Sequence, residues 1–459
     1  MPSTLRSGLL WLLLVLVPAG WIGLSMHEEG DRAAASATAE SHPELSSITT
    51  MQGRLAVLLG YQALEAENPL GTRPMAHLAA GMVLANTGQR ERAEAQVQLA
   101  ADATRNAPEP TLVAAVRAIV LAWPEEGRLA TGTLTAEQWT LVQERMGWFG
   151  SLARAKLEGD PVAQKHIDED QVWLLYGIIL AGVWFLGAGL AGLALVITLG
   201  VLAATGKVRS AMQAMPQALA ERGLQRVLGE TFICWMLLFL LLRVLVGRVG
   251  DDAPTAGSAW KSAALTFASL GALAWPLWRG VSWRDLRDVT GLRMPGNVWR
   301  LARLSAASYM SALPFMALGV LIGQWLAGVL GGRSFQDVSH PVQELLPGAS
   351  VGMALALFFA ASVAAPVVEE TVFRGLLYGH VRQQTWGWPR WLSILAAMLF
   401  SATIFAAIHP QGVLAVPALA GVSIGFCITR EWSGSVVPGM VAHGLHNGVL
   451  LALNLLLNG

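Results

Sequence analysis

Long apolar runs separated by short polar segments fill most of the chain. About 20 consecutive apolar residues cross a bilayer as a helix. On this basis we predict spans near 172–204, 229–249, 260–279, 305–332, 350–380, 390–409, 411–429 and 434–457. A further run covers Gly8 to Ser25 near the N-terminus. The pattern predicts an all-α fold: a polytopic membrane bundle of about eight to nine transmembrane helices.

The first run, within residues 1–26, predicts a membrane anchor or a signal peptide. Arg6 precedes it and acidic residues follow at 28, 29 and 31, which places the N-terminus in the cytoplasm. The nearest small-residue cleavage pattern, at 35–37, comes about ten residues too late for a signal peptide. We therefore favour an uncleaved anchor.

Residues 27–170 differ in kind, since they are polar and Ala-rich with apolar residues at helical spacing. They predict an extramembrane α-helical domain. Small residues between Ala80 and Ala100, including Gly81 and Gly88, weakly resemble one tetratricopeptide-like hairpin. The alternative is a generic helical hairpin with small residues where its helices cross. A domain of either kind can bind a partner protein.

The charges of the loops predict the orientation. Basic residues gather in the loops 204–228 and 279–303, with Arg382, Arg390 and Arg430 on the same side, whereas the alternate loops are mainly acidic. Positive loops stay in the cytoplasm. The 27–170 domain then lies on the outer side of what we expect to be a bacterial inner (plasma) membrane. The spans of 171–339 receive no role from the sequence.

Composition narrows the class of protein. Hydrophobic residues make up 54% of the chain and charged residues 14%, so lipid is an expected partner. Lys+Arg and Asp+Glu number 31 each, which argues against nucleic acid as a partner because that needs a basic face. The only cysteines, Cys234 and Cys427, lie inside apolar runs and support neither a disulfide framework nor a thiolate metal site.

Three charged residues near the C-terminus lie inside an apolar stretch. Between 350 and 459 the residues Arg382, Arg390, Arg430 and Glu431 fall at predicted helix ends, where charge costs little, but Glu369, Glu370 and Arg374 do not. Ionisable groups at membrane depth usually face a bundle interior and mark a functional site.

Helix geometry separates the roles of these three residues. Glu370 and Arg374 are four positions apart and can neutralise each other on one face. Glu369 points about 100° away and lacks that partner, which suits a general base. The alternative interpretation is an ion-pair network that only fixes helix packing.

Further polar residues interrupt the next apolar runs. His409 ends one run, and His443 and Asn447 share a helix face in the last span. A carboxylate, two imidazoles and an amide gathered in one cavity could activate water, hold a divalent metal and stabilise an oxyanion. We expect both imidazoles and the Glu369 carboxylate to lie within about 8 Å of one another, close enough to share one metal or one water network.

These residues carry a family resemblance. Residues 369–374, Glu-Glu-Thr-Val-Phe-Arg, are similar to the EExxxR motif of the CPBP intramembrane metalloproteases, the CAAX prenyl protease 2 and Abi group. Phe405 to His409 is similar to the FxxxH motif of that family, and His443 to Asn447 to its HxxxN motif. The resemblance covers about residues 340–459.

The resemblance implies hydrolysis of a peptide bond of a peptide or protein substrate, within or near the bilayer and similar to CAAX processing. Glu369 would activate the water. His409 and His443, with Glu369, would bind a divalent metal, for which we expect Zn²⁺, or would polarise the scissile carbonyl. Asn447 would hold the oxyanion, while Glu370 and Arg374 set the position and charge of Glu369. His446 is an additional histidine near the same face as His443.

Three other interpretations compete. Gly421 to Gly425 reads GxSxG, so an intramembrane serine protease could use Ser423, although glycines at this spacing in an apolar helix more often serve packing. A non-catalytic scaffold with a partner-binding outer domain is the second, and a transporter is the third.

Overall fold

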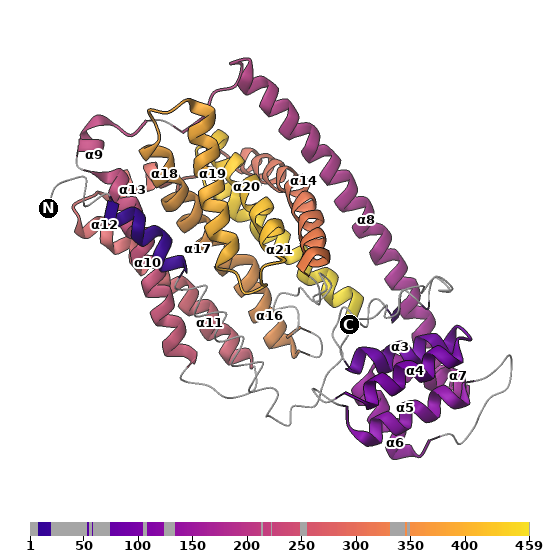
Figure 1. Cartoon of the computed structure of the whole chain (residues 1–459). Helices are drawn as coiled ribbons and strands as arrows, with labels where there is room; N and C mark the ends of the chain where they lie inside the picture. Colours follow the sequence, from indigo (N-terminus) through magenta and orange to yellow (C-terminus); the bar gives the residue numbers. More distant parts are fainter. Residues whose placement is uncertain are drawn as a thin grey trace. The chain divides into compact units, whose positions relative to one another are not determined.

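The computed structural model describes residues 8–19, 53–54, 57, 74–103, 108–123, 134–212, 214–221, 223–247, 255–330, 345–346 and 349–458. Within these ranges all regular structure is helical, which confirms the predicted fold class (Figure 1). The chain forms two compact units. We call Glu28–Gly182 with Leu453–Gly459 the N-terminal unit, and Met1–His27 with Val183–Ala452 the membrane unit.

The N-terminal unit is built from short helices around an apolar core. These are α3 (Pro74–Asn86), α4 (Arg90–Ala101), α5 (Pro110–Ala122), α6 (Ala136–Met146), α7 (Trp148–Glu158) and the start of α8 (Pro161–Ala204). α3 and α4 form a hairpin that turns at Gly88, whose φ of +77° favours glycine. A Cβ on Gly81 would lie 2.9 Å from Val97, so this glycine lets the two helices approach closely. The tetratricopeptide kinship and the extramembrane location of this region stay predictions.

The membrane unit holds the longer apolar helices together with several short ones. After the end of α8 its helices are α9 (Gln217–Glu221), α10 (Leu224–Gly247), α11 (Ala256–Ala268), α12 (Ala274–Trp278), α13 (Trp283–Thr290), α14 (Val298–Leu330), α16 (Val351–Phe359), α17 (Ala365–Glu369), α18 (Tyr378–Gln384), α19 (Arg390–Ala407), α20 (Val416–Ser433) and α21 (Val437–Asn458). A shorter apolar helix covers Gly8–Ala19.

Five helices in the described part of the chain are long and apolar enough to cross a membrane. They are Gln164–Ala204, Leu224–Val244, Val298–Leu330, Val351–Gln384 and Arg390–Ala407. Each overlaps a span that the hydropathy pattern predicts. The protein is therefore an integral membrane protein. The full count of eight to nine spans stays a prediction.

One pair of helices crosses at very close range. On α20, Gly421 faces the backbone of Phe315 and Gly425 faces Ala312, both on α14, and a Cβ at either glycine would clash there. Small residues at such crossings let two backbones approach within a membrane. This contact fixes α20 in the bundle.

The candidate site lies on the rod Val351–Gln384. Figure 1 shows α16, α17 and α18 following one another along this rod, beside α19, α20 and α21. Two π-helical segments, Ala360–Ala364 and Glu370–Leu377, flank α17. Such segments widen a helix locally and often occur at functional sites. Glu369 ends α17 and Glu370 begins the second segment, so the two carboxylates stand at this junction.

Candidate active site

Glu370 forms a buried ion pair with Arg374, as their spacing predicts. Arg374 Nη1 lies 2.9 Å from Glu370 Oε1, and both side chains are closed to solvent. His443 Nδ1 lies 3.0 Å from the same oxygen, so Glu370 also holds α21 through this histidine. Charges taken out of water need such partners, because an unpaired buried charge is strongly unfavourable.

Glu369 faces the two predicted histidines. Its Oε2 lies 3.8 Å from His443 Nε2 and 3.9 Å from His409 Nε2. These distances are well inside the expected 8 Å but too long for direct hydrogen bonds. The Glu369 side chain keeps 22% of its exposure, whereas Glu370 keeps 1%. Glu369 is thus the accessible carboxylate of the pair.

The other nitrogen of each imidazole has an acceptor. His409 Nδ1 donates to the backbone carbonyl of Phe405, one turn earlier in α19. His443 Nδ1 donates to the Glu370 carboxylate. Because a carbonyl and a carboxylate can only accept, each Nδ1 carries the hydrogen and each neutral ring presents the lone pair of Nε2 toward Glu369. Three acceptor atoms therefore converge on one small space.

A donor set of two imidazole nitrogens and one carboxylate has the chemistry of a zinc site. Its spacing is wider than that of tetrahedral zinc, where ligands about 2.0–2.1 Å from the metal lie roughly 3.4 Å apart. Among the described residues, no three His, Cys, Asp or Glu side chains have the arrangement of a metal site. A metal held by His409, His443 and Glu369 stays a prediction.

The Asn447 amide is bonded to the backbone of the rod. Its Nδ2 donates to the carbonyl oxygen of Ala361, at 2.7 Å, in the π-helical segment before α17. Gly444, on the same helix, faces the Ser362 carbonyl so closely that a Cβ would clash. Asn447 and Gly444 therefore hold α21 against the rod. The oxyanion role of Asn447 stays a prediction.

Aromatic rings enclose the charged groups. Arg374 Cζ lies 4.5 Å from the ring centroid of Phe405 and 5.3 Å from that of Phe426. Phe426 also stacks on His443, with centroids 5.3 Å apart, and Phe405 lies 4.4 Å from the His409 ring. These contacts hold the cation and both imidazoles in place.

Sequence reasoning missed Phe426 and Gly439. A Cβ on Gly439 would lie 3.1 Å from Glu370 Oε2, so this glycine leaves room for the carboxylate. Phe426 stands in the apolar helix α20, where a phenylalanine by itself suggests only packing. Neither residue carries a chemical signal of its own, and only the packing of α20 and α21 against the rod reveals them.

We expected charges near the helix ends to cost little free energy. This expectation was wrong for Arg382, Arg430 and Glu431. All three are buried. Arg382 Nη2 lies 3.2 Å from Glu431 Oε1, and the hydroxyl of Tyr378 donates to Glu431 Oε2 at 2.6 Å. The segment near Ala211 covers these helix ends, since its backbone nitrogen donates to the carbonyl of Glu431.

Ser423 lies inside α20 and is fully buried. A nucleophile elbow needs a strand-to-helix turn, and Ser423 has helix on both sides. The flanking Gly421 and Gly425 pack against α14, as described above. The geometry therefore favours the packing interpretation of this motif.

The segment that holds this site matches a known family model. Residues 351–449 match the family model for Rce1-like proteins, type II CAAX prenyl endopeptidases. The match confirms the resemblance over this segment, which includes Glu369, His409, His443 and Asn447. Comparisons with curated proteins and with solved structures each found no match. The proteins of that model are endopeptidases, that is, hydrolases, and the match covers less than half of the chain.

Proposed function

We propose that the protein is a glutamate-dependent intramembrane peptidase that cleaves a peptide bond of a peptide or protein substrate at or near the membrane. One observation carries the proposal: the accessible Glu369 carboxylate faces two imidazole Nε2 atoms at 3.8 and 3.9 Å. This arrangement lies within the segment that matches the Rce1-like model.

Glu369 is the base in this proposal. A water molecule between Glu369 and the imidazoles donates its hydrogens to these acceptors and directs its oxygen at the substrate carbonyl. As the new C–O bond forms, Glu369 takes one proton from the water. When the C–N bond breaks, Glu369 returns that proton to the leaving amine, and the other product is a carboxylic acid.

Glu370 positions His443 rather than meeting the substrate. Its carboxylate, 3.0 Å from Nδ1, fixes the hydrogen on that nitrogen and directs Nε2 toward Glu369 and the water. Arg374 pairs with the same carboxylate and holds it in place. Asn447 would donate to the developing oxyanion only after releasing the Ala361 carbonyl.

A divalent metal, with Zn²⁺ as the expected ion, would be held by Glu369, His409 and His443. When bound, it would make water acidic enough to ionise near neutral pH. Elemental analysis of the purified chain and of His409→Ala tests this part. We expect close to one zinc per chain, lost in the variant. Metal-free protein with full turnover would restrict the mechanism to Glu369.

The proposal includes a topology. We place the protein in a bacterial inner membrane with its N-terminus and basic loops in the cytoplasm. The N-terminal unit then faces the outer side, where it is free to bind a partner protein. Membrane lipid surrounds the apolar helices.

The reaction itself can be tested with purified protein in detergent. A peptide ending in a CAAX sequence, farnesylated or unmodified, is incubated with the full chain, and products are identified by mass spectrometry. We expect release of the last three residues, without an acyl-enzyme intermediate. A covalent adduct at Ser423 would instead revive the serine mechanism.

A further inference from the structure

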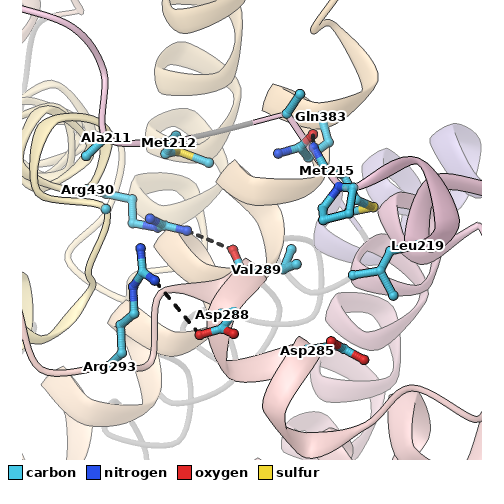
Figure 2. A pocket seen from close by; sticks show the side chains of 13 residues that line it. Ala211, Met212, Met215, Leu219, Asp285, Asp288, Val289, Arg293, Gln383 and Arg430 are labelled. Atoms are coloured by element: carbon cyan, nitrogen blue, oxygen red, sulfur yellow. Dashed lines mark hydrogen bonds and ion pairs between the residues drawn. The ribbon is translucent and has the colours of Figure 1, made fainter.

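A second site lies at the end of the rod that bears Gln383. A cavity of about 270 Å³ is lined there by α13, by residues 211–212 and 214–216, and by residues of α18 and α20 (Figure 2). Figure 2 shows the side chains of Arg293 and Arg430 on one wall and those of Asp285 and Asp288 on α13. None of these residues belongs to the candidate active site.

The arginines that line this cavity keep donors without an acceptor. Arg430 is buried; its Nη2 donates to the carbonyl of Val289 at 2.8 Å, but its Nε has no acceptor among the described residues. Arg293 Nη1 lies 3.9 Å from Asp288, beyond hydrogen-bond distance.

The second carboxylate is already engaged. Asp285 Oδ2 accepts a hydrogen bond from the Ser282 hydroxyl at 2.6 Å, and Ser282 in turn caps the start of α13. Among the described residues, neither carboxylate therefore accepts a hydrogen bond from Arg293 or Arg430. A buried guanidinium with free donors is costly, and it offers the geometry that binds phosphate through paired hydrogen bonds.

The position of the cavity suggests the source of such a group. Gln383 stands at the end of the apolar helix Val351–Gln384, and the next apolar helix begins at Arg390. Trp388 and Trp391, between and just after these points, are exposed. Tryptophan and helix ends mark the level of the lipid headgroups, and basic loops attract anionic lipid.

We propose that this cavity binds a phosphate group, and that its source is the headgroup of an anionic phospholipid. The phosphate oxygens accept from the guanidinium groups of Arg293 and Arg430. The bound headgroup then links α13 to the end of α20 and stabilises the loops around them.

Native mass spectrometry of the full chain in detergent provides the test. Dioleoylphosphatidylglycerol is titrated in one arm, dioleoylglycerol, which lacks the phosphate, in a second, and inorganic phosphate in a third. The variant is Arg293→Gln, because that side chain is exposed and we expect its loss to leave the fold intact. Arg284→Gln, an exposed arginine on the same helix outside the cavity, is the matched control.

We expect binding of phosphatidylglycerol but not of dioleoylglycerol. Its dissociation constant should rise about tenfold in Arg293→Gln, since a charge-assisted hydrogen bond is lost, and stay unchanged in Arg284→Gln. Arg430→Lys, which keeps the charge but not the paired donors, should weaken binding too. Equal affinity in wild type and Arg293→Gln would overturn the site. Inorganic phosphate at millimolar concentration displacing the lipid fully would overturn the lipid as its source.

Discussion

Glu370 carries its charge in a place closed to water, and two side chains share that charge. Arg374 and His443 contact the same carboxylate oxygen, at 2.9 and 3.0 Å. Replacing Glu370 with Gln removes the negative charge and leaves the Arg374 guanidinium buried without a counterion. We expect the free energy of unfolding to fall by about 3–5 kcal/mol.

The thiol of Cys427 can report this loss. It is fully buried in α20, and Cys234 is the only other cysteine, so a thiol-reactive dye in a Cys234→Ala background follows unfolding of the membrane unit. Asp288→Asn is the control, because it breaks an exposed ion pair and should cost less than about 1 kcal/mol. Equal shifts in the two melting curves would mean that the buried pair contributes little.

Phe426 is a positioning residue in our account. It contacts both Arg374 and His443 but no substrate. Phe426→Leu should lower kcat roughly twofold to thirtyfold with little change in KM, since the aromatic and cation–π contacts contribute about 0.5–2 kcal/mol. Phe400→Leu, whose ring packs on Trp11, is the control and should leave kcat unchanged. A change in KM alone would contradict the positioning role.

At the scale of the helices, the crossing of α14 and α20 fixes the wall that carries Phe426. A methyl group on Gly425 would overlap Ala312, whereas one on Gly328 of α14 would meet nothing within 4 Å. Gly425→Ala should therefore destabilise the membrane unit by about 1–3 kcal/mol. Gly328→Ala should be neutral or stabilise by up to about 1 kcal/mol. Similar melting temperatures for both variants would refute the close crossing.

The pattern of apolar and polar residues predicted the helices more completely than it predicted the contacts between them. Hydropathy located the five long apolar helices, and spacing predicted the Glu370–Arg374 pair and the meeting of Glu369 with both histidines. The burial of Arg382 and Glu431 was not predictable, because it depends on a loop some 170 residues or more away in sequence. The Ala361 partner of Asn447 was likewise hidden, since a backbone carbonyl in a widened helix leaves no mark in a pattern of side chains.

At the scale of the whole molecule, the charge of the loops predicts the side of the membrane on which the N-terminal unit and the basic loops lie. Leu99 on α4 is exposed, so a cysteine there is accessible to reagents. In intact cells, Leu99→Cys should react with a membrane-impermeant thiol reagent, whereas Arg284→Cys in a basic loop should react only after lysis. The reverse labelling pattern would invert the topology.

The central claim is that Glu369 activates the water that cleaves the substrate, and turnover of Glu369→Gln tests it most directly. The amide fills nearly the same space but cannot take a proton, so we expect turnover to fall by about 10²–10⁴-fold. The Cys427 melting curve should stay within about 1 kcal/mol of wild type, because Glu369 is partly exposed and forms no close ion pair. Ser423→Ala, measured beside it, should retain full turnover. Wild-type turnover in Glu369→Gln would contradict the role of Glu369 as the base, whatever the result for Ser423→Ala.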